Sequence, residues 1–383
     1  MKKSTVKLMS LIGLGLITTL NSCSEDDGTE PTKNITPTIT TPTTYEFSRN
    51  GSSSVSYSGQ TDRLNQLAEI KDVLKKGDNG EVILAKTLED MFANTNDNGG
   101  GNFSFTTTKQ LKSKTFTIDQ TYFEDLFNAA EQASNSGAIK IVAANGTAGL
   151  ATRASGKTIL VDENGREFTQ LIEKGLMGAT FYNQIVNTYL TDERVGDQVN
   201  NADLEAGKNY TKMEHHMDEA FGYVGAPVDF RSNYSGKGTV RYWANYSNNA
   251  DDNIQMNDRL MNAFKRARAA IVEKKYSIRD EEVAKIHQEF EVLIAATAIH
   301  YANETKAATN DGDRLHVLSE CYAFTRALRY SNMNNRKLTQ AEVDDLLENK
   351  IGSNFWKIKE QNLNLLIDKL ASTYELEAVK DQL

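Results

Sequence analysis

Proline is nearly absent from the long C-terminal part of this 383-residue chain, and this constrains the fold more than any other feature. Pro31, Pro37 and Pro42 precede residue 45, and Pro227 is the single proline after it. A proline inside a helix removes a hydrogen bond and clashes with the preceding turn, so helices avoid it. The stretch from 45 to 383 therefore favours long, uninterrupted helices.

Apolar residues recur in several segments at the three- and four-residue spacing of an amphipathic helix. The clearest are Leu64/Leu67/Ile70/Val73/Leu74, Tyr122/Phe123/Leu126/Phe127/Ala130 and Ile286/Phe290/Leu293/Thr297/Tyr301. Further helices are predicted at about 167–191, 213–222, 253–275, 313–330, 354–372 and 375–382. Thr339-x-x-Glu342 and Ser277-x-x-Asp280 match the capping box with which many helices begin.

Strand patterns are few and short. Strands are plausible at 45–57, 103–116 and 158–161, and the last of these ends in an Asn164-Gly165 turn. The predicted class is therefore all-α, a helical bundle or two packed bundles with minor β-hairpin additions.

The first 22 residues are predicted to be a signal peptide. Lys2, Lys3 and Lys7 precede an apolar run from 8 to 20, which is shorter than the ~20 residues that a membrane span needs. The sequence Leu20-Asn21-Ser22-Cys23 resembles the bacterial lipobox, which implies that Cys23 is diacylated and becomes the new N-terminus. Acyl chains would then anchor the protein in the outer membrane.

Residues 23–44 are predicted to be a linker, followed by a helical domain from 45 to 383. The acidic run at 24–27 resembles the export signal of Bacteroidetes-type lipoproteins, which implies display on the outer face of the outer membrane. The rest of the linker is rich in threonine and proline, a composition typical of a disordered spacer.

Charge and cysteine content limit the possible functions. Removal of the signal peptide changes the formal net charge from −9 to −12, and an acidic surface argues against a nucleic-acid partner. Cys23 and Cys321 are the two cysteines, so there is no disulfide framework and the core must hold the fold. Cys321 stands among aromatic residues of a predicted helix and is interpreted as a core thiol.

One stretch matches a relaxed phosphate-loop pattern but does not fit its structure. Residues 151–158 read Ala-Thr-Arg-Ala-Ser-Gly-Lys-Thr. A phosphate loop must open a helix, whereas a strand pattern and a turn follow here. We therefore expect no nucleotide site at this position.

The densest polar cluster runs from Glu214 to Glu219. On a helix, Glu219 lies one turn from both His215 and His216, so an imidazole and a carboxylate can point to one place. Such a group suits a metal ion, iron or zinc, or a proton-transfer pair. The alternative is a buried histidine that is satisfied by a neighbouring carboxylate.

A second pair, His316 and Glu320, has the same i,i+4 spacing on a face of small residues. Polar groups on a packed face need partners, so we expect a buried hydrogen-bonded dyad and keep both as secondary site candidates. His287 lies near an apolar stripe and is interpreted as a core histidine.

Four sequence blocks resemble a family of Bacteroidetes lipoproteins that has no assigned activity. They lie at 45–51, 55–64, 173–179 and 215–227. Within the last block, His216-Met217-Asp218-Glu219 is similar to the His-x-x-Glu of the imelysin family, although Glu214 replaces the glycine that usually stands two residues before the histidine. The resemblance implies an all-α, exported protein associated with iron uptake.

The resulting hypothesis is a surface lipoprotein that binds a nutrient, iron or another metal species, for uptake without catalysis. His216, Glu219 and His215 are the proposed ligands, and a TonB-type receptor is the expected partner. An alternative is a glycan- or peptide-binding lipoprotein that uses exposed aromatic residues such as Tyr242, Trp243 and Tyr246. A zinc peptidase is a third hypothesis, although catalytic zinc normally needs three protein ligands.

Overall fold

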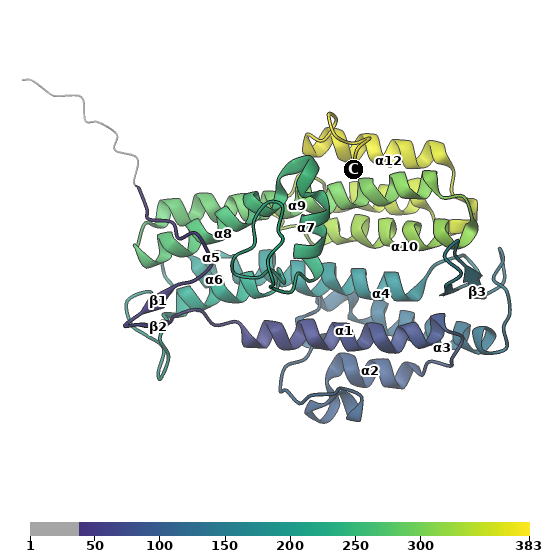
Figure 1. The fold of residues 1–383 in the computed structure, drawn as a ribbon, viewed down its shortest axis with the longest axis horizontal. Coiled ribbons are helices and arrows are strands. Elements are labelled where there is room, and N and C mark those ends of the chain that lie inside the picture. The colour runs from purple at the N-terminus through teal and green to yellow at the C-terminus, as the bar shows by residue number, and fades with distance from the viewer. Residues whose placement is uncertain (1–37) are drawn as a thin grey trace, which may run out of the picture. The chain divides into compact units, whose positions relative to one another are not determined.

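Twelve α-helices account for half of residues 38–383, the part of the chain that the computed structural model describes (Figure 1). They span Ser58–Asp78 (α1), Ala85–Ala93 (α2), Gln120–Ala138 (α3), Phe168–Leu176 (α4), Asp192–Val195 (α5), Lys212–Gly222 (α6), Tyr242–Ile254 (α7), Met256–Val272 (α8), Tyr276–Ala307 (α9), Asp311–Ala327 (α10), Gln340–Asp345 (α11) and Glu360–Tyr374 (α12). Two antiparallel hairpins accompany them in these residues, Ser48–Arg49 (β1) with Ser52–Ser53 (β2) and Gly149–Thr152 (β3) with Thr158–Val161 (β4). The prediction of an all-α protein with minor β-hairpins is confirmed.

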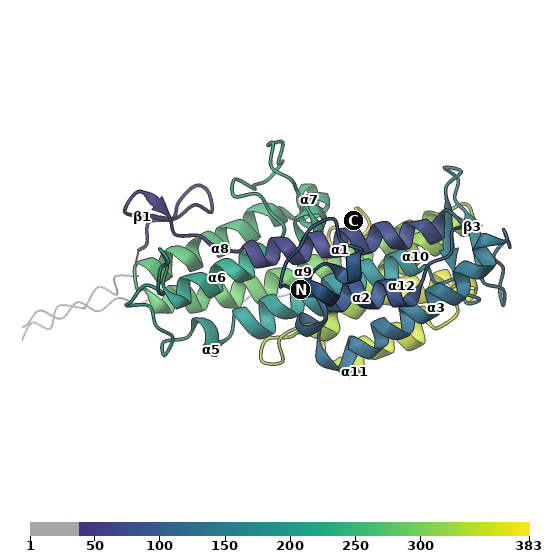
Figure 2. The same cartoon turned by 90° about the horizontal axis from the view of Figure 1, so that it is seen from below.

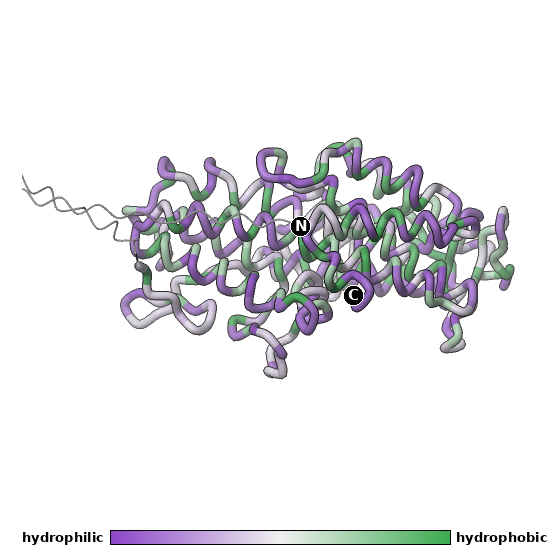
Figure 3. The backbone as a smooth tube through the Cα atoms, turned by 90° about the horizontal axis from the view of Figure 1, so that it is seen from above, coloured by the Kyte–Doolittle hydropathy of each residue, from purple (hydrophilic) through white to green (hydrophobic). Residues whose placement is uncertain are grey.

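The helices of residues 38–383 pack around one hydrophobic core. The long helix α9 packs against α8, α10 and α12, while α10 packs on α4 and α4 packs on α1. Helices α2 and α3 cover the other side of α1 (Figure 1, Figure 2). Hydrophobic and hydrophilic residues alternate along most helices, as amphipathic helices require (Figure 3). Helix α6 contacts both α1 and α8, which places it beside the start of α1.

The predicted apolar stripes are the buried faces of their helices. In α1, Leu64, Leu67, Ile70 and Leu74 are at most 4% exposed. Burying each such side chain contributes roughly 1.5–3 kcal/mol to stability. The stripes of α3 and α9 are buried in the same way, so these three predicted helices are confirmed.

One of the two predicted capping boxes is confirmed. Thr339 accepts a hydrogen bond from the Glu342 amide at 3.2 Å, and the Glu342 carboxylate accepts one from the Thr339 amide at 2.9 Å. The box at Ser277 is wrong, because α9 begins at Tyr276 and lacks a side-chain cap. Lys274 adopts a left-handed conformation in the short connection between α8 and α9. Helix α9 begins so soon after it that Ser277 lies inside the first turn of α9 and not before it.

The helix predicted at 167–191 is present but irregular. Helix α4 continues into two π-helical segments, Met177–Tyr182 and Ile185–Tyr189. Such segments are frequent at functional sites. The second segment ends at Tyr189, which lines the pocket described below.

The strand predictions are confirmed only in part. Strand β4 has the predicted bounds, whereas the 45–57 region contains only the short β1–β2 hairpin. The 103–116 prediction is wrong, because this segment is a loop with one 3-10 turn. Its alternating apolar residues, among them the buried Phe103 and Leu111, fix the loop to the core and do not pair with a strand. The 151–158 stretch forms the β3–β4 hairpin, which agrees with our exclusion of a phosphate loop.

The helix predicted at 375–382 is also wrong. Glu375 adopts a left-handed conformation with φ of 60°, which ends α12 at Tyr374, and turns follow. Helices α2 and most of α7 are absent from the predictions, because both are short and neither carries a long apolar stripe.

The predicted signal peptide, Cys23 and the first part of the predicted linker lie outside the described residues. The end of the linker is described and lies along α8. There, Thr40 donates its amide hydrogen to Glu273 at 2.8 Å, and Lys265 donates to the Thr43 carbonyl at 3.1 Å. Among residues 38–383, no helix combines the length and apolar character that a membrane crossing requires.

Candidate functional site

A polar pocket of about 300 Å³ opens beside α6, and it contains two of the three predicted site residues, His215 and Glu219. We call it the basic pocket. Its walls are the first two turns of α1, the loop between α2 and α3, Tyr189 and the loop that precedes α6. The same region brings together two of the sequence blocks quoted above, 55–64 and 215–227.

Four cationic side chains line the basic pocket: Arg63, Lys109, Lys114 and Lys208. Within residues 38–383, no carboxylate lies within 4.0 Å of any of these four charges. Burial and the nearby Arg63 cation lower the pKa of Lys114, and Glu219 opposes this only partly. Positive charge is therefore concentrated at one place in a protein of acidic net charge.

Arg63 is the most unusual of the four, because it is only 7% exposed. Its Nε donates to the Gln110 carbonyl and its Nη1 to the Gly59 carbonyl, both at 3.0 Å. Three other described arginines are buried, namely Arg268, Arg279 and Arg326, and each of them pairs with a carboxylate. A buried charge without a counter-charge is costly, so Arg63 is poised for an anion from outside the chain.

Helix side chains hold the lysine-bearing loop in place. The buried Gln66 of α1 donates to the Lys109 carbonyl at 2.6 Å, and Gln184 donates to the Lys114 carbonyl at 3.0 Å. The loop before α6 is held by Asn209, whose side chain donates to the Arg49 carbonyl at 2.9 Å. The lysine backbones are thus preorganised, which lowers the entropic cost of binding a ligand.

Glu219 is the one carboxylate among the residues that line the basic pocket. Its Oε1 accepts hydrogen bonds from Gln60 at 3.1 Å and from the Tyr189 hydroxyl at 3.2 Å. Its Oε2 lies 3.8 Å from Nε2 of His215. The His215 ring stacks on Tyr210, and its Nδ1 lies 3.0 Å from the Ser56 carbonyl. Because that carbonyl only accepts, Nδ1 carries the proton and Nε2 is left to face Glu219.

His216, the third predicted ligand, does not line the basic pocket. Its Nδ1 lies 2.6 Å from the Arg194 carbonyl and its Nε2 lies 3.3 Å from the Arg194 guanidinium. Burial lowers the pKa of His216, which keeps the ring neutral at physiological pH. The structure therefore brings His215 and Glu219 together and directs His216 to α5.

The secondary candidates do not form the expected dyad with each other. His316 Nδ1 lies 2.7 Å from Glu167, whereas Glu320 lies 3.8 Å from Lys174. Burial acts to lower the pKa of His316, but the hydrogen bond to Glu167 and the charges of Glu167 and Glu320 together outweigh it and raise this pKa. Tertiary packing thus supplies partners that helical spacing cannot reveal. Among residues 38–383, no group of three or more His, Cys, Asp or Glu side chains is arranged to hold a metal ion.

The aromatic residues suggested for glycan binding are not exposed. Trp243 is fully buried, and Tyr242 and Tyr246 are buried as well. Trp243 donates its indole hydrogen to the Met177 carbonyl at 3.2 Å and packs edge-on against Phe290. These rings belong to the core because α7 packs inward on α8 and α9, so the prediction of exposure is wrong.

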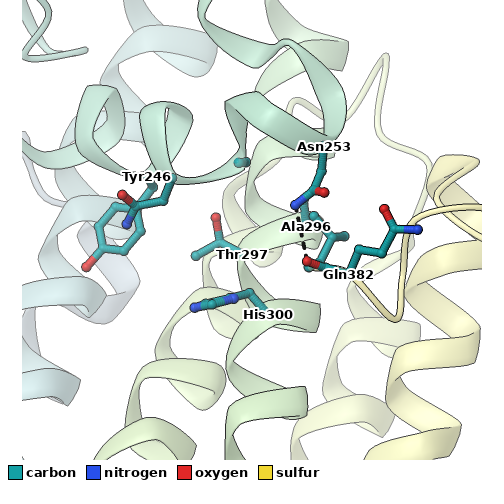
Figure 4. Close-up of a pocket in the computed structure, with 9 residues that line it drawn as sticks. Tyr246, Asn253, Ala296, Thr297, His300 and Gln382 are labelled. Atoms are coloured by element: carbon teal, nitrogen blue, oxygen red, sulfur yellow. Dashed lines mark hydrogen bonds between the residues drawn. The ribbon is translucent and has the colours of Figure 1, made fainter. Parts of the chain in front are cut away.

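A second and smaller pocket, of about 120 Å³, lies between α7, α9 and the C-terminal residues (Figure 4). Tyr246, Thr297 and His300 line one side of it, and Asn253 donates to the Gln382 carbonyl at 3.2 Å on the other. No Lys, Arg, Asp or Glu side chain is among the residues that line it. It lacks the concentration of charge that distinguishes the basic pocket.

A different face of α6 carries a buried ion-pair cluster, Glu214 and Asp218 with Arg49 and Arg268. Arg49 contacts Glu214 at 2.9 Å, and Arg268 contacts Glu214 at 3.0 Å and Asp218 at 2.9 Å. Tyr45 donates to Asp218 at 3.0 Å. The cluster ties the segment from Tyr45, which includes the β1–β2 hairpin, to α6 and α8.

The sequence identified the pair on α6 but missed the four cations. Arg63 stands in a quoted block, yet its burial depends on the fold. The available signal was a basic segment, since three lysines fall within residues 109–114 of an acidic chain.

Comparison with known proteins gives one result. Residues 42–377 match the family described as a domain of unknown function, DUF4856. No curated protein and no solved structure matches the chain. The match covers the described helices and both α6 clusters, and the chain therefore belongs to the DUF4856 family.

Proposed function

We propose that this protein is a surface lipoprotein, anchored through Cys23, that binds a small anionic nutrient in the basic pocket and hands it on for uptake without catalysis. The observation that carries the proposal is the buried Arg63, which has no carboxylate within 4.0 Å among residues 38–383, together with three lysines around one cavity. A ligand with a negative group would supply the missing charge.

The clustered cations of the basic pocket favour the binding of an anion. Two isolated positive charges in a partly buried site repel each other, and an anion between them converts this repulsion into attraction. Burial is the main cause of the lowered pKa of Lys114, and repulsion by Arg63 adds to it. Helix α1 adds to the field, because its N-terminus carries a partial positive charge and opens at the pocket.

The proposal also constrains the metal hypothesis. A bare metal cation near Glu219 would face four positive side chains, which would repel it. Iron taken up through this pocket would therefore have to arrive as an anionic chelate, with the cations binding the carboxylate or phosphate groups of the chelator. The imelysin-like role in iron uptake and a TonB-type receptor remain compatible with such a ligand.

The proposal can be tested by isothermal calorimetry on the full-length protein purified in neutral detergent. Phosphate, sulfate, citrate and ferric citrate would be titrated at constant ionic strength. We expect at least one anion to bind, and Arg63→Met to weaken that binding by about 10–100-fold, the effect of losing a charged hydrogen bond. Lys306→Met removes an exposed lysine far from the pocket and serves as the control. Equal affinities of wild type and Arg63→Met would contradict the proposal.

A further inference from the structure

We infer that the basic pocket selects an anion that carries its own proton, a hydrogenphosphate or a protonated phosphate ester, and that Glu219 rejects sulfate. This inference rests on the proposed function, because it names the class of anion that the pocket binds. It follows from the supply of donors in the pocket and from the single acceptor placed among them.

The donors outnumber what a carboxylate ligand needs. Backbone amides add to the four cations, because Ser58 and Gly59 begin α1 and line the pocket. Tyr57, at the N-cap, provides no side-chain cap, and its carbonyl accepts from Gln60 and Thr61. Neither the Ser58 nor the Gly59 amide donates to any residue within 38–383. A tetrahedral oxyanion has enough oxygen atoms to use helix amides, guanidinium and ammonium groups together.

Arg63 makes this more than an uncapped helix terminus. It projects from the second turn of α1 and is buried, and its hydrogen bond to the Gly59 carbonyl fixes it beside the first turn. Arg63, Ser58 and Gly59 therefore line one cavity from one rigid element. Guanidinium groups match the geometry of phosphate oxygens, which favours this class of ligand.

Glu219 is an acceptor within this set of donors. Oε1 is already used by Gln60 and Tyr189, so Oε2 is the oxygen that remains for a ligand. A carboxylate repels a fully deprotonated anion, but it accepts a hydrogen bond from an anion that bears an O–H group. Hydrogenphosphate bears such a proton at neutral pH, and sulfate does not.

Glu219 thus gives the pocket a preference for hydrogenphosphate over sulfate that Coulomb attraction to the cations alone cannot give. Sulfate would place an oxygen lone pair against Oε2 of Glu219, an unpaired contact between like charges. A site that leaves a polar group unpaired with the wrong ligand discriminates strongly against it. Glu219 is thus a specificity-determining residue in a pocket whose other charged side chains are the four cations.

The test compares sodium phosphate, sodium sulfate and glycerol 3-phosphate by calorimetry at pH 7 and constant ionic strength. Wild type is expected to bind phosphate at least about tenfold more tightly than sulfate, and Glu219→Gln to reduce that ratio at least about tenfold, mainly by gaining sulfate affinity. The glutamine keeps an oxygen for Gln60 and Tyr189 and adds a donor for sulfate. Glycerol 3-phosphate, titrated also at pH 6 where about half of it keeps a phosphate proton, distinguishes an ester ligand from free phosphate.

Glu304→Gln, a change at an exposed position of α9, is the matched control and should leave the ratio unchanged. Thermal unfolding of each variant verifies that the fold is intact. Equal binding of phosphate and sulfate by wild type, or an unchanged ratio in Glu219→Gln, overturns the inference while anion binding stands. If no anion binds wild type, the proposed function fails together with it.

Discussion

Two faces of the same helix, α6, carry charge in opposite ways. Glu214 and Asp218 point to the N-terminal segment and α8, where Arg49 and Arg268 balance them. Glu219 points to the basic pocket, where four cations surround it without an ion pair of their own. The first face is saturated by the protein itself, and the second is not.

The difference separates charge that holds the fold from charge that is available to a ligand. In the ion-pair cluster, each group also makes further hydrogen bonds, for example from Arg268 to the Ser54 carbonyl at 3.1 Å. Burial acts to raise the pKa of Glu214, but Arg49 and Arg268 outweigh it and lower this pKa. In the basic pocket, burial and the Arg63 cation lower the pKa of Lys114, and Glu219 opposes them only partly.

The largest expected effect is a loss of stability on the face of α6 that carries Glu214 and Asp218. Arg268→Met leaves two buried carboxylates with less compensation, so the free energy of unfolding should fall by about 3–5 kcal/mol. Urea unfolding followed by circular dichroism measures this loss. Lys86→Met is the control, because its exposed pair with Asp90 contributes only about 0–1 kcal/mol. Similar losses in both variants would show that the cluster does not stabilise the fold as a balanced unit.

A smaller effect concerns pH and Asp218. Burial raises the pKa of Asp218 to about 6, although Arg268 acts to lower it. Its folded pKa thus exceeds the ordinary 3.8, so the folded state holds the proton between these values and stability falls as pH rises from about 4 to about 6. At about 1.4 kcal/mol per pKa unit, the contribution is at most about 3 kcal/mol.

Asp218→Asn should remove this part of the pH dependence. Unfolding free energies at pH 4, 5, 6 and 7 give the difference between wild type and variant. We expect wild type to lose stability relative to Asp218→Asn across this interval, and the difference to be constant above pH 7. A constant difference throughout would mean that Arg268 and the hydrogen bonds from Tyr45 and the Ser56 amide keep Asp218 charged at all these pH values.

The fold was largely predictable because its helices are amphipathic and uninterrupted by proline. The stripe in α1 led directly to the correct helix, since a surface helix buries one face whatever its partner is. The 103–116 loop was not predictable in this way. Its buried Phe103 and Leu111 imitate a strand pattern, although both side chains belong to the hydrophobic core and the segment forms no strand.

The candidate site was predictable only within one helix. The i,i+4 pair His215 and Glu219 share a face, because four residues advance an α-helix by little more than one turn. His216 is one residue on and therefore points about 100° away, toward Arg194. Lys109 and Lys208 come from loops without periodicity, so only the tertiary structure could place them beside Glu219.

The smallest effect on stability is expected from two lysines of one loop. They also give the sharpest test of the difference between the two faces of α6. Lys112 forms an ion pair with Glu124 at 2.6 Å, whereas Lys114 has no carboxylate partner in residues 38–383. The folded pKa of Lys114 lies below its ordinary 10.5, so the charged form opposes folding at neutral pH. This penalty begins to fall as pH rises past the folded pKa and is gone above 10.5.

Lys114→Met should therefore leave the free energy of unfolding unchanged or raise it, by no more than about 0.5 kcal/mol, while Lys112→Met should lower it by about 0–1 kcal/mol. In the presence of phosphate, Lys114 should matter more for stability than Lys112. A bound anion stabilises the folded state, so phosphate should raise the melting temperature of wild type and of Lys112→Met, and raise it less for Lys114→Met. Thermal unfolding with and without phosphate measures both quantities. If Lys114→Met destabilised the protein as much as Lys112→Met and responded equally to phosphate, Lys114 would be an ordinary surface charge, and the contrast between the two faces of α6 would lose its functional meaning.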